Sequence, residues 1–225
     1  MKPILFNTEM VRAILNGRKT VTRRLLKPRY LEGEAGFQII TNKHTGEFVR
    51  VEIVDEYEEE TRWLAPPYLP GDILYVRETW HKDTGRYMFK ANYSDTEKFY
   101  RNGKEVQIKW RPSIHMPKEA TRIFLRVKNV WAEQLQKITV NSIEREGIQP
   151  RRPAGMYGIG CRCSSYVEGC LEAPCPNRDA YIRLCYVTAF SELWDSTIKA
   201  SDRDSYGWPA NPWVWVIEFE RIEHI

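Results

Sequence analysis

The chain has 225 residues, of which 42% are hydrophobic, so it can bury a core and wholesale disorder is excluded. The net charge of +4 is too weak to indicate nucleic-acid binding by itself. No apolar run reaches the length of a membrane span, and the N-terminus lacks the layout of a signal peptide. We therefore expect a cytoplasmic protein that makes no membrane contact.

The first elements are a strand, a helix and a second strand. Residues 3–6 favour a short strand, and Asn7 or Thr8 can cap the helix that follows, because a short polar side chain accepts from the first free N–H groups. Gly17 stands where a helix usually ends. Residues 20–22 are β-branched at each position and predict an extended exit.

The middle of the chain predicts further strands. Residues 37–40 and 48–53 flank a turn-rich stretch, which indicates a hairpin inside an elaboration at about 31–65. The turn at 70–72 precedes three more expected strands. These are residues 73–76, 87–91 and 123–128.

The C-terminal third combines a helix, an insertion, a second helix and a strand. Thr139 can cap a helix that runs to Glu146, and Gly147 would end it. An irregular insertion rich in Cys and Arg spans about 149–180. Residues 189–198 then carry helical signals, and 213–219 are typical of a strand. The whole predicts an α+β protein, with an antiparallel or mixed β-barrel and short helices at its ends.

The segment from Gly17 to Arg24 has residues suited to catalysis. A threonine hydroxyl becomes a nucleophile when a base takes its proton, and a neutral lysine amine is one such base. Thr22 follows Lys19 by three residues, so strict strand alternation would put the two side chains on opposite faces, and a bend after Gly17 would be needed. The alternative is a solvated basic face that includes Arg23.

Glu146 is unusual because of its place at the end of a predicted helix. A carboxylate there faces the negative end of the helix dipole, which opposes its charge. This position suits a general acid or base. A surface carboxylate paired with Arg145 or a nearby lysine is the alternative.

The segment Gly17-Arg18-Lys19-Thr20-Val21-Thr22-Arg23-Arg24 resembles the signature of the ASCH domain, Gly-x-Lys-x-x-Glu-x-Arg. Thr22 replaces the glutamate, as in small bacterial ASCH enzymes that hydrolyse the acetyl amide of N4-acetylcytidine. The resemblance implies a single PUA-like domain over residues 1–225, with elaborations at about 31–65 and 149–180. It also implies a nucleoside-handling protein.

The same resemblance implies catalytic roles. Lys19 would take the proton from Thr22 or from a water, Thr22 would attack the acetyl carbonyl, and Glu146 would protonate the leaving amine. Arg24 would hold a phosphate or brace the pocket, and no cofactor is needed for catalysis. Members of this fold also include RNA binders and a ribonuclease activity, so an RNA- or DNA-binding module and a ribonuclease are alternatives. The oligomeric state stays open.

Other segments resemble a larger, phage- or prophage-type ASCH branch. They are 76–80, 112–117 and 208–215. The candidate substrate-binding residues besides Arg24 are Arg23, Arg77, Glu78, Trp80, His115, Tyr206 and Trp208. Packing in the core is the alternative for the tryptophans, and a structural hydrogen bond is the alternative for the histidine.

Four cysteines crowd into the insertion: Cys161, Cys163, Cys170 and Cys175. Four thiols in a short irregular loop are compatible with structural zinc, which takes soft ligands in a tetrahedron. Reduced or loosely paired thiols are the alternative. Cys185 lies in an apolar stretch and is expected in the core.

Overall fold

The structure is a computed structural model that describes residues 1–26, 36–41, 48–54, 62–150 and 178–223. The chain divides into two compact units. The first comprises Met1–Thr20, Pro67–Val130 and Ile217–Ile225, and the second comprises Val21–Pro66 and Trp131–Val216.

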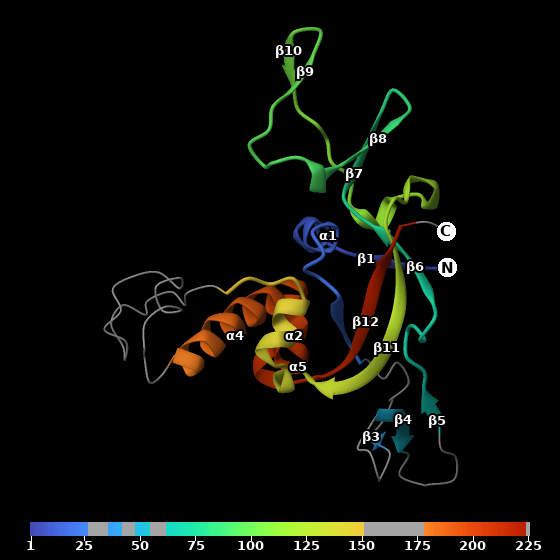
Figure 1. The fold of residues 1–225 in the computed structure, drawn as a ribbon, viewed down its shortest axis with the longest axis vertical. Helices are drawn as coiled ribbons and strands as arrows, with labels where there is room; N and C mark the ends of the chain where they lie inside the picture. Colours follow the sequence, from blue (N-terminus) through green and yellow to red (C-terminus); the bar gives the residue numbers. More distant parts are fainter. Residues whose placement is uncertain (27–35, 42–47, 55–61, 151–177, 224–225) are drawn as a thin grey trace. The chain divides into compact units, whose positions relative to one another are not determined.

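A five-stranded mixed sheet has the order β1-β6-β11-β12-β2. Its strands are β1 (Lys2–Leu5), β6 (Ile73–Arg77), β11 (Phe124–Gln134), β12 (Trp213–Ile222) and β2 (Val21–Leu25). β1 pairs with β6 in parallel, whereas β11 pairs with β6 antiparallel. Figure 1 shows the two longest strands, β11 and β12, side by side. The predicted α+β class with a mixed sheet is confirmed.

Helix α1 (Thr8–Leu15) of the first unit begins and ends where the sequence predicts. The Asn7 side chain accepts from the N–H of Met10 at 2.8 Å and caps the first turn. Gly17 has a φ of +72°, and the N–H groups of Gly17 and Arg18 donate to the carbonyls of Ile14 and Ala13. This is the Schellman arrangement, which satisfies carbonyls at the helix end and turns the chain sharply.

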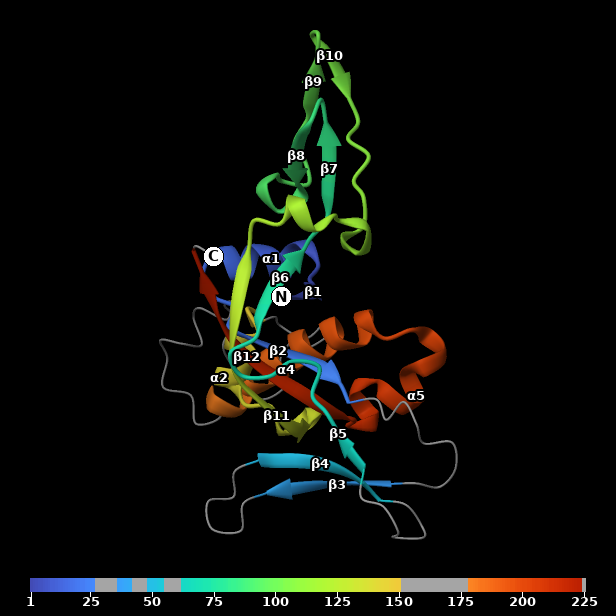
Figure 2. The ribbon, with the colours of Figure 1, turned by 90° about the vertical axis from the view of Figure 1, so that its right-hand side faces the viewer.

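Two β-hairpins of the first unit stand beside each other (Figure 2). One consists of β7 (Trp80–Asp83) and β8 (Arg86–Phe89), and the other of β9 (Phe99–Arg101) and β10 (Lys104–Val106). The strand predicted at 87–91 therefore stops at Phe89, because Lys90–Asn92 turn into a 3-10 helix, η1. Two further 3-10 turns follow, η2 (Ser113–His115) and η3 (Lys118–Ala120).

The second unit contains the hairpin predicted near residue 45. β3 (Gly36–Thr41) pairs antiparallel with β4 (Phe48–Val54), which confirms the prediction. A third strand, β5 (Arg62–Leu64), pairs with the other edge of β4.

The helices of the second unit are η4 (Leu135–Lys137), α2 (Val140–Arg145), α4 (Arg178–Thr197), η5 (Ala200–Asp202), α5 (Arg203–Tyr206) and η6 (Trp208–Ala210). Of these, α2 begins where the sequence predicts, whereas α4 begins at Arg178, well before the predicted residues 189–198. The Thr139 hydroxyl accepts from the N–H of Ser142 at 3.2 Å and caps α2, as predicted. Gly147 follows α2 with a φ of +83° and ends it.

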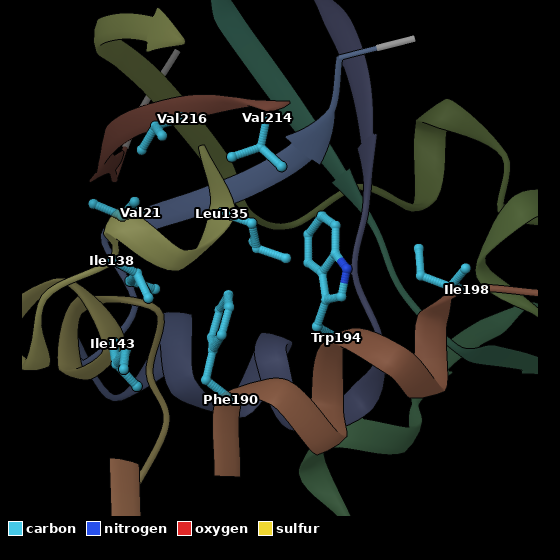
Figure 3. Close-up of a cluster of buried hydrophobic side chains, with 9 residues drawn as sticks. All are labelled: Val21, Leu135, Ile138, Ile143, Phe190, Trp194, Ile198, Val214 and Val216. Atoms are coloured by element: carbon cyan, nitrogen blue, oxygen red, sulfur yellow. The ribbon is translucent and has the colours of Figure 1, made fainter. Parts of the chain in front are cut away.

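The apolar core of the second unit gathers side chains from β2, β12, α2, α4 and the segment around η4 (Figure 3). Its buried members are Val21, Leu135, Ile138, Ile143, Phe190, Trp194, Ile198, Val214 and Val216. Figure 3 shows Phe190 and Trp194 pointing from α4 toward Leu135, and their rings stack with centroids 6.3 Å apart. This cluster fixes α4 and α2 against the same group of strands. Within the described ranges, no helix has the length and apolar character required to cross a membrane.

Candidate functional site

Few polar or charged side chains are buried in the part of the chain that the structure describes. Among the described residues, the buried polar or charged ones are Lys19, Thr22, Arg23, Glu78 and Glu146. All five were candidates from the sequence. Burying a charge is costly unless it is paired, so each of these side chains needs a specific environment.

β2 presents its residues on two faces. Val21 belongs to the core cluster of the second unit and Leu25 packs against it, so Arg23 between them lies on that same face. Thr22 and Arg24 lie on the other face, so the alternation of β2 does not bring Thr22 to the Glu146 carboxylate that Arg23 contacts. Thr22 is only 1% exposed, so both faces of β2 are covered at this point.

The Arg23 cluster consists of Arg23, Glu133, Ser142 and Glu146, all in the second unit. The guanidinium of Arg23 donates to Glu133 Oε1 at 2.7 Å, to the Ser142 hydroxyl at 2.8 Å and to Glu146 Oε1 at 3.0 Å. Its central carbon lies 6.0 Å from the ring centroid of Phe190. The fork geometry of the guanidinium lets one cation hold two carboxylates and a hydroxyl at once.

Glu146 occupies the C-cap of α2, the position that the sequence indicated. Arg23 supplies the positive charge that offsets the unfavourable helix dipole there. The N–H groups of Gly147 and Ile148 donate to the carbonyls of Glu144 and Ile143, which fixes the backbone on both sides of Glu146. A carboxylate that is 5% exposed is thus held in one defined position.

Lys19 lies in the first unit, two residues after the glycine that ends α1. It is 2% exposed and is among the largest fully buried side chains of the described chain. Its N–H donates to the carbonyl of Ala13 at 3.1 Å, and its Nζ lies 5.6 Å from the ring centroid of Phe6. The regular strand β2 begins only at Val21, so strict alternation does not govern the step from Lys19 to Thr22.

Glu78 is the other buried carboxylate, and it lies in the first unit. Arg122 binds it through both oxygens, at 2.8 Å and 2.9 Å, and also donates to Asn92. The guanidinium stacks over Phe89 at 4.2 Å from the ring centroid. A bidentate pair of this kind ties β6 to the segments around it and favours a structural role for Glu78.

Three further candidates of the first unit have different surroundings. Trp80 is buried against Met116 and Ala120, which is the core packing given above as the alternative to base stacking. Arg77 donates to the backbone carbonyls of Met116 and Ile114. His115 is exposed in η2.

Tyr206 and Trp208 of the second unit are half-buried and pack against the core cluster. The Tyr206 carbonyl accepts from the indole of Trp194 at 2.9 Å, and Trp208 meets Phe190 edge-on at 5.8 Å. Asp195 accepts from the Trp208 N–H at 2.7 Å. These contacts favour structural packing for both rings.

The four cysteines proposed as zinc ligands, Cys161, Cys163, Cys170 and Cys175, lie outside the described residues. Within the described ranges there is no group of three or more His, Cys, Asp or Glu side chains that could hold a metal ion. Cys185 is buried in α4, as predicted.

Glu133 and Ser142 were not candidates from the sequence, although they complete the Arg23 cluster. Ser142 precedes Glu146 by one helical turn, so an i,i+4 reading of α2 would have placed them on one face. Glu133 lies on β11, far from Arg23 in sequence. Only the tertiary fold could reveal that contact.

Tyr186 on α4 is hydrogen-bonded to a carboxylate of α2. The Tyr186 hydroxyl donates to Glu144 Oε1 at 2.6 Å. Burial, reinforced by this bond to a carboxylate, raises the pKa of Tyr186 to about 12. The phenol therefore stays protonated throughout the physiological range and links α4 to α2.

Protein-family models, curated proteins and solved structures were compared with the chain, and none of them matches.

Proposed function

We propose that the protein is a hydrolase of the ASCH type, with a PUA-like barrel, that removes an acyl group from a modified base such as N4-acetylcytidine. The observation that carries the proposal is the burial of Lys19, Thr22 and Glu146. An amine, a hydroxyl and a carboxylate are the three groups that this chemistry requires.

Each of the three side chains has one role in the proposed reaction. Lys19, as the neutral amine, accepts the proton of the nucleophile. Thr22 Oγ1 forms a bond to the acyl carbon, and the C–N bond then breaks as Glu146 gives its proton to the departing exocyclic nitrogen. Water then attacks the acyl-threonine carbonyl and gives a proton to the Glu146 carboxylate, while Lys19 returns its proton to the departing Thr22 Oγ1, so the free acid leaves and all three side chains regain their starting forms. Because Thr22 and Glu146 lie on opposite faces of β2, the second route of the proposal is direct attack by a water that Lys19 activates, and no acyl-enzyme forms in it.

Arg23 is a positioning residue in this proposal. It is already committed to Glu133, Ser142 and Glu146, which supports orientation of the Glu146 carboxylate rather than contact with the substrate. Arg24, on the same face of β2 as Thr22, is the better candidate for contact with a phosphate or sugar.

The test is turnover of N4-acetylcytidine, followed by mass spectrometry as release of cytidine and acetate. Lys19→Met and Glu146→Gln keep side-chain size, so we expect folded proteins with at least about 100-fold lower kcat, the usual contribution of a general acid or base. Thr22→Val removes only the hydroxyl. Its loss of activity with retention in Thr22→Ser would identify Thr22 as the nucleophile, and full activity would assign that role to water.

Glu133→Gln is the matched control for Glu146→Gln. Both changes neutralise one carboxylate of Arg23, but only Glu146 is assigned a proton transfer. We expect Glu133→Gln to keep most of kcat. Equal losses in both variants would show that Glu146 matters only through the ion cluster, and no turnover by the wild-type chain would remove the proposal.

A further inference from the structure

A cavity of about 430 Å³ lies in the first unit between the two hairpins β7-β8 and β9-β10. It is separate from every residue to which the proposed hydrolase assigns a catalytic role. Its volume falls in the range of sites that hold small molecules. Figure 2 shows the two hairpins that form its sides.

Strand register explains which side chains face the cavity. In β9-β10, Phe99 pairs with Val106 and Arg101 with Lys104, so these four share one face. In β7-β8, His81 pairs with Met88 and Asp83 with Arg86, and these share a face in the same way. Six of these eight side chains line the cavity, and Lys109 from the segment after β10 lines it too. The six are His81, Asp83, Met88, Phe99, Arg101 and Val106.

Two polar contacts connect the segments that line the cavity. Arg101 forms an ion pair with Asp83 between the hairpins. The carbonyl of Lys109, in the segment after β10, lies 3.0 Å from His81 Nδ1. The ring of Trp110 meets those of His81 and Phe99 at 6.4 Å and 6.1 Å. These contacts hold the cavity in a defined shape.

The chemistry of the walls is divided between apolar and cationic groups. Met88, Phe99, Val106 and Ile108 offer an apolar surface that suits a flat ring. Three cations line the cavity against a single carboxylate, Asp83. These are Lys82, Arg101 and Lys109.

Lys109 is the cation best placed to meet an anion. Within the described ranges, no carboxylate lies within ion-pair distance of its amine, and the residue is exposed. Lys82, by contrast, donates to the Tyr87 hydroxyl at 3.3 Å and lies over that ring.

Charge in the sequence is concentrated in the same place. Residues 81–111 contain eight Lys or Arg and four Asp or Glu, a net charge of +4. The rest of the chain contains 26 of each kind, so this segment accounts for the whole net charge of the protein. A local excess of cations attracts anionic ligands more strongly than the same charge spread over the surface.

We propose that this cavity binds a nucleotide, with the base against the apolar wall and the phosphate at Lys109. A flat aromatic ring joined to an anion matches the two halves of the wall. The nucleotide can be free or can be one unit of a single strand. Binding here does not depend on the proposed hydrolase, because it requires none of Lys19, Thr22 or Glu146.

The experiment measures binding of adenosine monophosphate and of a single-stranded adenylate hexanucleotide to the full chain by calorimetry at low salt. We expect Lys109→Met to weaken binding about tenfold, the loss of one charge-assisted contact. Gln107→Glu places a negative charge at another exposed residue of the cavity without a change in size, and we expect a similar loss.

Lys98→Met is the matched control. Lys98 precedes β9 in the same hairpin and pairs with Glu105 at 3.0 Å, on the face opposite to Phe99. The Lys98→Met substitution removes the same charge from outside the cavity, so we expect less than a twofold change in binding affinity. Equal losses in Lys98→Met and Lys109→Met would overturn the proposal.

The two ligands identify the source of the nucleotide. Equal affinities would assign the cavity to a free nucleotide, and tighter binding of the hexanucleotide would assign it to a strand. A duplex of the same length hides its bases, so it should bind at least tenfold more weakly than the single strand. Equal binding of the duplex, or no binding of either ligand, would contradict the proposal.

Discussion

Charged side chains are mostly buried and paired in the Arg23 cluster, whereas they are mostly exposed in the hairpin cavity, which lies between the hairpins β7-β8 and β9-β10. In the cluster, a guanidinium and a carboxylate are nearly inaccessible to water, and Arg23 contacts two carboxylates and a hydroxyl. In the cavity, Lys109 and its neighbours stay in contact with solvent. A charge removed from water must be paired, and pairing fixes its position, whereas an exposed cation remains available for a ligand. The cluster is suited to hold a reacting group, and the cavity to attract an anion.

The two buried carboxylates, Glu78 and Glu146, also differ from each other in how their arginines hold them. Arg122 contacts both oxygens of Glu78, so one guanidinium satisfies that carboxylate. Arg23 donates to Glu146 Oε1 and divides its other donors between Glu133 and Ser142. The first arrangement is typical of a structural tie. In the second, one cation is shared by two carboxylates and a hydroxyl, which orients the Glu146 carboxylate.

The largest expected effect is on the stability of the cluster. Arg23→Met would remove the cation shared by the buried Glu146 and the partly exposed Glu133, so we expect the free energy of unfolding to fall by about 3–5 kcal/mol. Urea denaturation measures this change. The exposed pair of Arg126 with Glu220 gives the comparison, and Arg126→Met should cost less than about 1 kcal/mol. Similar losses of unfolding free energy in the two variants would show that burial does not make the Arg23 pairs more important than an exposed pair.

Salt should affect the two regions differently, because it screens exposed charges more than buried ones. Raising ionic strength from about 0.1 M to 0.5 M should weaken hexanucleotide binding about tenfold if two phosphates are neutralised. The stability difference between the wild type and Arg23→Met should stay nearly constant, because buried pairs are screened little. Calorimetry and denaturation at both salt concentrations give the two numbers. A binding constant that does not change with salt concentration would show that the cations of the cavity do not contribute to binding.

We expect the backbone conformation at the end of α2 to contribute less to the stability of the fold than Arg23 does. Gly147 has a left-handed conformation that a Cβ disfavours, so Gly147→Ala should cost about 1 kcal/mol of unfolding free energy. Gly17→Ala is the matched change at the end of α1, where a Cβ would meet nothing within 4 Å, so its cost is conformational alone. If Gly147→Ala cost as much as Arg23→Met, backbone geometry rather than charge would fix Glu146.

The smallest expected effect concerns Tyr186 at alkaline pH. Its pKa is raised from 10.0 to about 12, so the folded protein holds this proton more tightly than the unfolded chain does. Its contribution to stability is complete below pH 10 and is lost as the pH rises toward 12. The difference in ultraviolet absorbance between the wild type and Tyr186→Phe isolates this titration from the other eleven tyrosines. Glu144→Gln should lower the pKa part of the way to 10, and an unchanged midpoint would exclude the bond as a cause.

Local signals in the sequence were sufficient for most helix and strand positions. Asn7 and Gly17 mark the two ends of α1, and Thr139 and Gly147 mark those of α2, because caps and left-handed glycines act within a few residues. The hairpin β9-β10 was not predicted, since its short strands of mixed polar residues carry no clear alternation. Its tip has Asn102 and Gly103 at positive φ, a turn signal that would have indicated it.

The sequence by itself supplied the candidates for chemistry: Lys19 and Thr22 through the resemblance of their segment to the ASCH signature, and Glu146 through its place at a helix end. The tertiary structure decided what surrounds each of them. It buried all three and placed Glu133 and Ser142 around Arg23. It also built a cavity from two hairpins that are joined by Arg101 and Asp83. The physical reason is distance along the chain: caps and turns act between neighbours, whereas the ion pairs of Arg23 join residues more than a hundred positions apart, and the pair of Arg101 with Asp83 joins two separate hairpins.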